Sequence, residues 1–319
     1  MKKILAIFVA ISLIIACVIL GFVNGIKLDD LQLETLKILG IICGASILYC
    51  FVAGELSRNN SQMDKLWSVL PIAYVWVTCA MGGFKFRLII IAVIVTLWGL
   101  RLTYNFAKKG AYSIKFWSGE EDYRWIYLRK QKPFTNKFIW GIFDLLFIST
   151  FQNVVVLGIT LPAVAIMSST AALSVFDIIA GVLMLGALIY EIIADKQQNA
   201  FQTKKYEYLN KGMKLEELPE PYNRGFNVTG LWARSRHPNY IGEQLIWVGL
   251  YLFCIGANVC HYLVFNWSIT GVMLLIMIFV GSSRMAEGIS VTKYAEYASY
   301  QKQVFKYLPI RKYKSKNEN

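Results

Sequence analysis

Apolar runs close to twenty residues long recur along this chain of 319 residues, and they are the strongest constraint on its fold. A run of that length spans the hydrocarbon layer of a bilayer, where the backbone must satisfy its own hydrogen bonds as a helix. Hydrophobic residues make up 56% of the chain. We therefore expect a single all-α membrane domain over residues 1–319, a polytopic bundle of about eight transmembrane helices. The expected spans are residues 4–23, 36–54, 66–83, 88–106, 138–167, 175–194, 241–257 and 262–281.

The distribution of positive charge predicts how these spans are oriented. The net charge is +13, and residues 108–137, 196–236 and 284–316 each hold eight basic residues. Basic loops stay on the cytoplasmic side, so we expect both termini there, with the first helix retained and not cleaved as a signal peptide. Anionic lipid head groups account for the charge more simply than nucleic acid does. We therefore expect membrane lipids as partners and no nucleic acid, and the oligomeric state stays open.

Several kinds of site are excluded by what the sequence contains. It has only two histidines, His237 and His261, which excludes a histidine-box di-iron centre. The six cysteines form no CxxC pair and lie mostly in apolar runs, so we interpret them as packing residues and expect no metal site. Neither GxGxxG nor a P-loop pattern is present. A bound dinucleotide would therefore lie among helices and loops, on arginines, amides and a tyrosine.

The stretch from Thr229 to Glu243 carries the clearest functional pattern. Pro238 fits the first turn of a helix, where its missing N–H is no loss. Asn239 and Glu243 are four residues apart and therefore share one face of that helix. Two polar side chains on one face of an expected membrane span indicate a site.

Basic and aromatic side chains flank the start of this helix. Arg236 and His237 come just before it, and Tyr240 lies in its first turn. Cations and free backbone donors at a helix N-terminus suit an anionic ligand such as a phosphate. The alternative is an interfacial anchor, in which these side chains only extend to lipid head groups. That alternative explains Trp232 and Arg234, but it does not explain the polar pair deeper in the helix.

A second polar face leaves the sixth expected span. Glu191, Asp195 and Asn199 recur every four residues and therefore line one side of a helix. Acids inside membrane helices usually face a cavity or a partner. Solvation of a helix end is the alternative for Asp195 and Asn199, and it explains Glu191 less well. We expect this face to belong to the same site.

Three other segments leave two interpretations open. Residues 101–105 and 120–125 are either interfacial charges or the lining of a cytoplasmic mouth. Asp144, Gln152 and Asn153 in the fifth span either bond between helices or border a substrate pocket. The fifth span also contains Pro162, which predicts a kink.

The C-terminal segment carries Arg284 and then Tyr294, Tyr297 and Gln301 at helical spacing. One interpretation is a juxtamembrane helix lying in the membrane interface. The other is a flap that covers a nucleotide.

Taken together, the strings Ser235–Tyr240 with Gly242 and Glu243 resemble the membrane steroid 5-alpha-reductase-like family, in particular a bacterial branch once catalogued as a domain of unknown function. Sterol C14-reductases and isoprenylcysteine methyltransferases show related Arg-His-Pro patterns. The resemblance covers residues 64–309, leaving N-terminal helices in residues 1–60 and a basic tail at 310–319. It implies NADPH as cofactor. It also implies the cofactor-binding residues, which are Asp195, Asn199, Arg236, His237, Asn239, Tyr240, Arg284 and Tyr294.

The expected function is that of a membrane-embedded, NADPH-dependent reductase of a carbon–carbon double bond, conjugated to a carbonyl, in a steroid-like, isoprenoid or other lipophilic substrate. Glu243, and second Glu191, are the expected catalytic groups near the reacting centre. One alternative is an S-adenosylmethionine-dependent methyltransferase of the isoprenylcysteine type. Another is a transporter or non-enzymatic scaffold, against which the absence of an internal repeat speaks. The expected location is the plasma membrane of a bacterium or the endoplasmic reticulum of a eukaryote.

Overall fold

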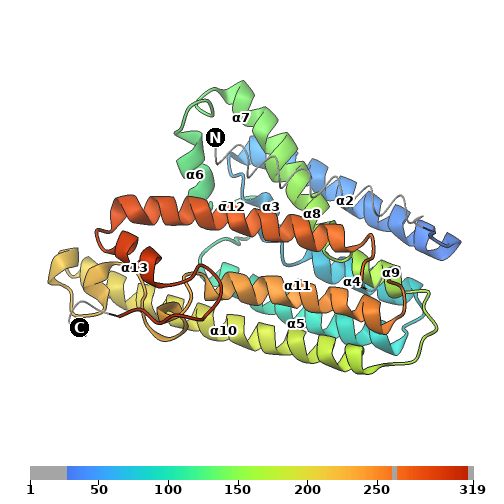
Figure 1. Ribbon diagram of the computed structural model, residues 1–319. Coiled ribbons are helices and arrows are strands. Elements are labelled where there is room, and N and C mark those ends of the chain that lie inside the picture. Colours follow the sequence, from blue (N-terminus) through green and yellow to red (C-terminus); the bar gives the residue numbers. More distant parts are fainter. Residues whose placement is uncertain (1–26, 261–263, 315–319) are drawn as a thin grey trace, which may run out of the picture. The chain divides into compact units, whose positions relative to one another are not determined.

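The computed structural model describes residues 27–260 and 264–314. Every regular element in these ranges is helical, which confirms the all-α prediction for the described residues (Figure 1). The α-helices are α2 (Asp30–Ser57), α3 (Gln62–Leu66), α4 (Leu70–Met81), α5 (Phe86–Lys108), α6 (Tyr123–Arg129), α7 (Lys137–Phe143), α8 (Gln152–Gly158), α9 (Leu161–Ile166), α10 (Val175–Asn210), α11 (Pro238–Gly256), α12 (Ile269–Lys293) and α13 (Tyr297–Gln303). A π-helix, η1 (Asp144–Phe151), follows α7, and 3-10 turns lie at Leu215–Glu217, Tyr222–Arg224 and Gly230–Ala233.

Five helical stretches are long and apolar enough to cross a membrane, by length and composition. They are Asp30–Ser57, Phe86–Lys108, Lys137–Ile166, Val175–Asn210 and Ile269–Lys293. Two further expected spans correspond to the shorter helix α4 and to α11, and the first expected span lies outside the described residues. The count of eight and the orientation of the termini therefore stay predictions.

The helices belong to two compact units of the chain. The first unit comprises residues 1–181 and 249–275, and the second comprises residues 182–248 and 276–319. Helices α10, α11 and α12 contribute residues to both units. Each unit is described below by itself.

A buried ion pair joins the ends of helices in the first unit. Arg87, near the start of α5, donates to both carboxylate oxygens of Asp177 in α10, with N···O distances of 2.7 and 3.1 Å. The same guanidinium donates to the carbonyl oxygens of Ala171, Ala172 and Gly256. Both charged side chains are less than a tenth exposed. Removing either partner would leave a charge buried without its counterion.

The fifth expected span is interrupted twice. Its middle is the π-helix η1, which the sequence pattern did not predict. Regular α-helix then ends at Gly158, and a new helix begins at Leu161 with Pro162 in its first turn. Gly158 lies directly against Gly271 of α12, where an added Cβ would come within 2.0 Å of backbone atoms. The two helices can approach this closely only because neither residue has a side chain.

Buried polar side chains lie in and around α3 in the same unit. The ammonium group of Lys65 is fully buried and donates to the carbonyl oxygens of Phe116 and Ser118. The amide of Asn60 donates to Asp144 of η1 at 2.8 Å, and its oxygen accepts from the indole N–H of Trp140. These bonds hold the loop after α5 and the start of η1 against α3.

In the second unit, the C-terminal segment packs against the loop that precedes α11. Helix α13 folds back beside the end of α12 (Figure 1). Backbone N–H groups of Arg236 and His237 donate to the carbonyls of Phe305 and Lys306, and Tyr313 donates to Ala233. An aromatic cluster fills the space between the two segments, and its members are Phe226, Val228, Tyr294, Tyr297, Tyr300, Val304 and Tyr313.

Candidate functional site

The second unit brings α10 and α11 together at one small residue. A Cβ on Gly242 of α11 would lie 2.8 Å from the Cβ of Glu191 and 3.2 Å from the carbonyl oxygen of Ala187. Because two of its near neighbours are backbone atoms of α10, only glycine allows the helices this close. The predicted polar faces of the two helices therefore meet.

One predicted pair is hydrogen-bonded across this contact. The amide nitrogen of Asn239 donates to Oδ1 of Asp195 at 3.3 Å. The amide oxygen of Asn239 is buried and has no hydrogen-bond partner among the described residues. A buried amide oxygen without a donor is unfavourable and fits a ligand that supplies one. Asn199, one turn beyond Asp195, is exposed and takes no part in this pair.

The two predicted catalytic acids are buried in these helices. Glu191 and Glu243 are 4% and 3% exposed. The indole N–H of Trp247 donates to Oε1 of Glu243 at 3.1 Å, one turn along the same helix. Glu243 therefore lies one turn deeper in α11 than Asn239, as its spacing predicted.

Arg236 is held by the protein itself. Its Nε and one terminal nitrogen donate to the two carboxylate oxygens of Glu287, at 2.8 and 3.3 Å. Its other terminal nitrogen donates to the carbonyls of Gln301 and Val304, at 2.8 and 2.7 Å. Four of the five guanidinium N–H groups point at internal acceptors in this arrangement. Arg236 therefore fastens the C-terminal segment to α12, and phosphate binding by it stays a prediction.

His237 shares the carboxylate of Glu287. Its Nε2 lies 3.0 Å from Oε1 of Glu287, and the imidazole is almost fully buried. Burial lowers the pKa of His237, although the bond to Glu287 opposes that shift. Since a carboxylate accepts, the neutral ring carries its hydrogen on Nε2, which leaves Nδ1 as an acceptor.

The remaining predicted residues take different positions. Tyr240 stacks on the ring of His237, with the ring centroids 5.1 Å apart, and meets Phe279 edge to face. Arg284 of α12 is exposed and makes no ion pair with the described residues. Tyr294 lies between α12 and α13 and covers Gly225, whose φ of +79° is the left-handed conformation that favours glycine. Tyr294 thus packs against the aromatic cluster, and cofactor binding by it stays a prediction.

Sequence reasoning missed how much of this site rests on residues far along the chain. Gln301 and Lys306 also contact Glu287, at 3.1 and 3.5 Å. The hydroxyl of Tyr300 donates to the carbonyls of Trp232 and Ser235. In the sequence, Glu287 stands out only as an acid one turn beyond Arg284. Its position relative to Arg284 does not identify the residues that it contacts in the fold.

The fold and the site together define a class of protein. It is a helical protein with several helices apolar enough to cross a membrane and a partly buried cluster of carboxylates, an amide and an arginine at the start of one helix. The chain belongs to the family described as "Protein of unknown function (DUF1295)", whose model matches residues 50–304.

One relative of the chain is the Schizosaccharomyces pombe protein described as "Uncharacterized protein C594.04c". The two are 35% identical over 281 residues, which cover 82% of this chain and 78% of the relative. No solved structure matches the chain.

Proposed function

We propose that the protein is a membrane-embedded, NADPH-dependent reductase of the steroid 5-alpha-reductase-like superfamily. It would reduce a carbon–carbon double bond conjugated to a carbonyl in a steroid-like, isoprenoid or other lipophilic substrate. The observation that carries the proposal is the meeting of α10 and α11, where Asn239 bonds Asp195 and two buried glutamates lie in the same helices. Acids buried in membrane helices are costly and usually face a cavity or pair with a partner.

The residues present fit the proposed cofactor. The open amide oxygen of Asn239 fits an amide or hydroxyl donor of a nucleotide. Arg284, which is exposed and makes no ion pair with the described residues, fits a phosphate. Because an exposed arginine suits the extra phosphate of NADPH, we expect NADPH to bind more tightly than NADH. NADPH would supply the hydride.

The protein's own residues would then orient the substrate and stabilise the charge that develops on its carbonyl oxygen. Glu243 lies one turn deeper in α11 than Asn239, where a lipophilic substrate would reach it. In its protonated form it would donate a hydrogen bond to the substrate carbonyl and stabilise the enolate that develops during reduction. Glu191 is the second candidate for this role. Because the apolar helices would exclude water, both the hydrogen bond to the carbonyl and the stabilisation of the enolate would be stronger.

We further propose eight spans, with both termini and the basic segments 108–137 and 196–236 in the cytoplasm. The membrane would be the plasma membrane in a bacterium and the endoplasmic reticulum in a eukaryote. Rapid labelling from outside intact cells, at cysteines introduced into these segments, would contradict the orientation.

The decisive experiment begins with the purified protein in detergent and compares binding of NADPH with that of S-adenosylmethionine. Binding of NADPH alone supports the proposal. Binding of S-adenosylmethionine alone would instead support the methyltransferase alternative, and binding of neither would favour a non-enzymatic role.

Two substitutions then separate chemistry from binding. Glu243→Gln should keep NADPH affinity and lower single-turnover hydride transfer by roughly 10²–10⁴-fold, the range for a lost general acid. Asn239→Ala should weaken NADPH binding as well. Glu207→Gln, the same change at an exposed acid of α10, is the matched control. If Glu243→Gln changes only thermal stability, the role of Glu243 is to accept from Trp247.

A further inference from the structure

Gln198 of α10 carries a buried side-chain oxygen that the fold does not satisfy. No hydrogen-bond donor among the described residues reaches its Oε1. The preceding residue shows the contrast, because Oε1 of Gln197 accepts from the backbone N–H of Leu231 at 2.8 Å. A buried acceptor without a donor is unfavourable, and native folds leave few polar groups in that state. The open oxygen of Gln198 therefore indicates a donor that comes from outside the chain.

Gln198 extends the polar face of α10 toward the start of α11. It lies about two turns beyond Glu191 and three residues beyond Asp195, so the three side chains share one side of the helix. Asp195 accepts from the amide nitrogen of Asn239, whose own oxygen is also buried without a partner among the described residues. Both open oxygens thus belong to residues that neighbour Asp195. Asn199, which the sequence pattern placed on this face, is exposed.

The chemistry of these open atoms defines the group that would bind them. Both are carbonyl oxygens of neutral amides, and the carboxylate of Asp195 lies beside them. Phosphate oxygens are acceptors as well, so a phosphate is disfavoured at this position. A group with two N–H donors on one nitrogen suits it, as in a primary amide or an aromatic amine. NADPH carries one of each, the carboxamide of its nicotinamide and the amine of its adenine.

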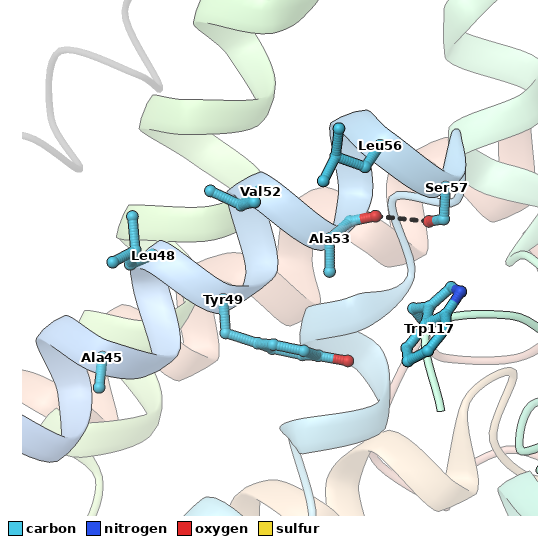
Figure 2. A pocket seen from close by; sticks show the side chains of 8 residues that line it. All are labelled: Ala45, Leu48, Tyr49, Val52, Ala53, Leu56, Ser57 and Trp117. Atoms are coloured by element: carbon cyan, nitrogen blue, oxygen red, sulfur yellow. Dashed lines mark hydrogen bonds between the residues drawn. The ribbon is translucent and has the colours of Figure 1, made fainter. Parts of the chain in front are cut away.

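The apolar groove along α2 in the first unit is a different kind of surface (Figure 2). Apolar side chains of α2 line it together with Trp117. The hydroxyl of Ser57 already donates to the carbonyl of Ala53. The hydroxyl of Tyr49 donates to the side-chain oxygen of Gln62. None of the residues that line the groove has a buried polar atom without a partner, so it leaves no such group open for a dinucleotide.

With NADPH as the cofactor of the proposed function, we infer that Gln198 is a further cofactor-contacting residue. Its Oε1 accepts one hydrogen of the nicotinamide carboxamide, and Oδ1 of Asn239 accepts the other. The carboxamide is assigned in preference to the adenine amine because Asn239 lies one turn from Glu243, the side chain proposed to meet the substrate. The ring that gives the hydride must lie near that substrate. Two bonds to the carboxamide fix how the ring is turned toward it.

The test compares NADPH with its 3-acetylpyridine analogue, in which a methyl group replaces the –NH2 of the carboxamide. Calorimetric titration of the full-length protein in detergent measures the affinity for each nucleotide. We expect the wild type to prefer NADPH by roughly 5- to 150-fold, the usual contribution of two hydrogen bonds. Gln198→Leu should reduce that preference by roughly 2- to 12-fold, the contribution of one. Gln202→Leu, the same change one turn further along α10, should leave the preference unchanged.

Two further measurements separate this contact from a structural role. Gln198→Glu keeps an acceptor oxygen and should keep the preference for NADPH. Gln198→Leu should not lower the unfolding temperature of the cofactor-free protein, because Oε1 has no bond to lose. A marked drop in that temperature would show that the amide is structural and would overturn the assignment.

The remaining outcomes distinguish this contact from the proposed function itself. Equal binding of the two nucleotides by the wild type, or an unchanged preference in Gln198→Leu, overturns the contact and leaves the reductase in place. So does a loss, in Gln198→Leu, of the preference for NADPH over its hypoxanthine analogue, which lacks the adenine amine. The open oxygens would then hold the other end of the cofactor. A wild type that binds none of these nucleotides contradicts the proposed function together with the contact.

Discussion

Arg236→Ala should release the C-terminal segment from the second unit. The substitution removes four hydrogen bonds from a side chain that is 11% exposed, two of them to a carboxylate that is 7% exposed. Breaking a buried pair by removing one partner destabilises by about 3–5 kcal/mol. Glu287 keeps contacts with His237 and Lys306, so its charge is not left alone, and we expect the lower end of that range.

Hydrogen exchange of backbone amides in α13 measures this effect directly. A loss of about 3 kcal/mol corresponds to roughly 10²-fold faster exchange, since 1.4 kcal/mol is a factor of ten. Arg236→Lys keeps the charge without the two-pronged geometry, so its exchange should be intermediate. Arg284→Ala, at an exposed arginine of α12, is the control and should leave α13 protected. Unchanged exchange in Arg236→Ala would refute the view that Arg236 fastens this segment.

Three further outcomes follow from other contacts. Burial lowers the folded-state pKa of His237 from its usual 6.5, so the unfolded state binds the proton more readily. The protection of α13 against hydrogen exchange should therefore be complete above about pH 6.5 and should decrease as the pH is lowered below that value. The His237→Gln variant should not show this pH dependence. Gly242→Ala should force α10 and α11 apart and lower stability by about 1–3 kcal/mol in thermal unfolding, whereas Gly288→Ala, with open space around it, should not. Asp177→Asn should lower the unfolding temperature far more than loss of a surface pair, because Arg87 would stay buried; a surface-like effect would show that the pair is solvated.

The sequence predicted local features of the site better than its long-range partners. Pro238 does begin α11, and Asn239 and Glu243 do share a helical face, because both depend only on helix geometry. The four-residue spacing of its polar residues also predicted the polar face of α10. In the structure Asn199 is exposed, whereas Asp195 is partly buried. The pairing of Arg236 with Glu287 was not readable, since a charge pattern does not say which distant acid an arginine will meet. The π-helix η1 was missed because its residues are as apolar as those of an ordinary span.

The backbone bonds from Arg236, His237 and Tyr313 have a consequence for biosynthesis. Arg236 leaves the ribosome before any of the acceptors that hold it in the folded protein. Val304 follows it by about 70 residues, which takes roughly 3–14 s at 5–20 residues per second. During that interval a guanidinium that will later be buried must remain with water or lipid head groups. The loop before α11 is therefore completed after translation has passed α13, and it depends on the last helix for its shape.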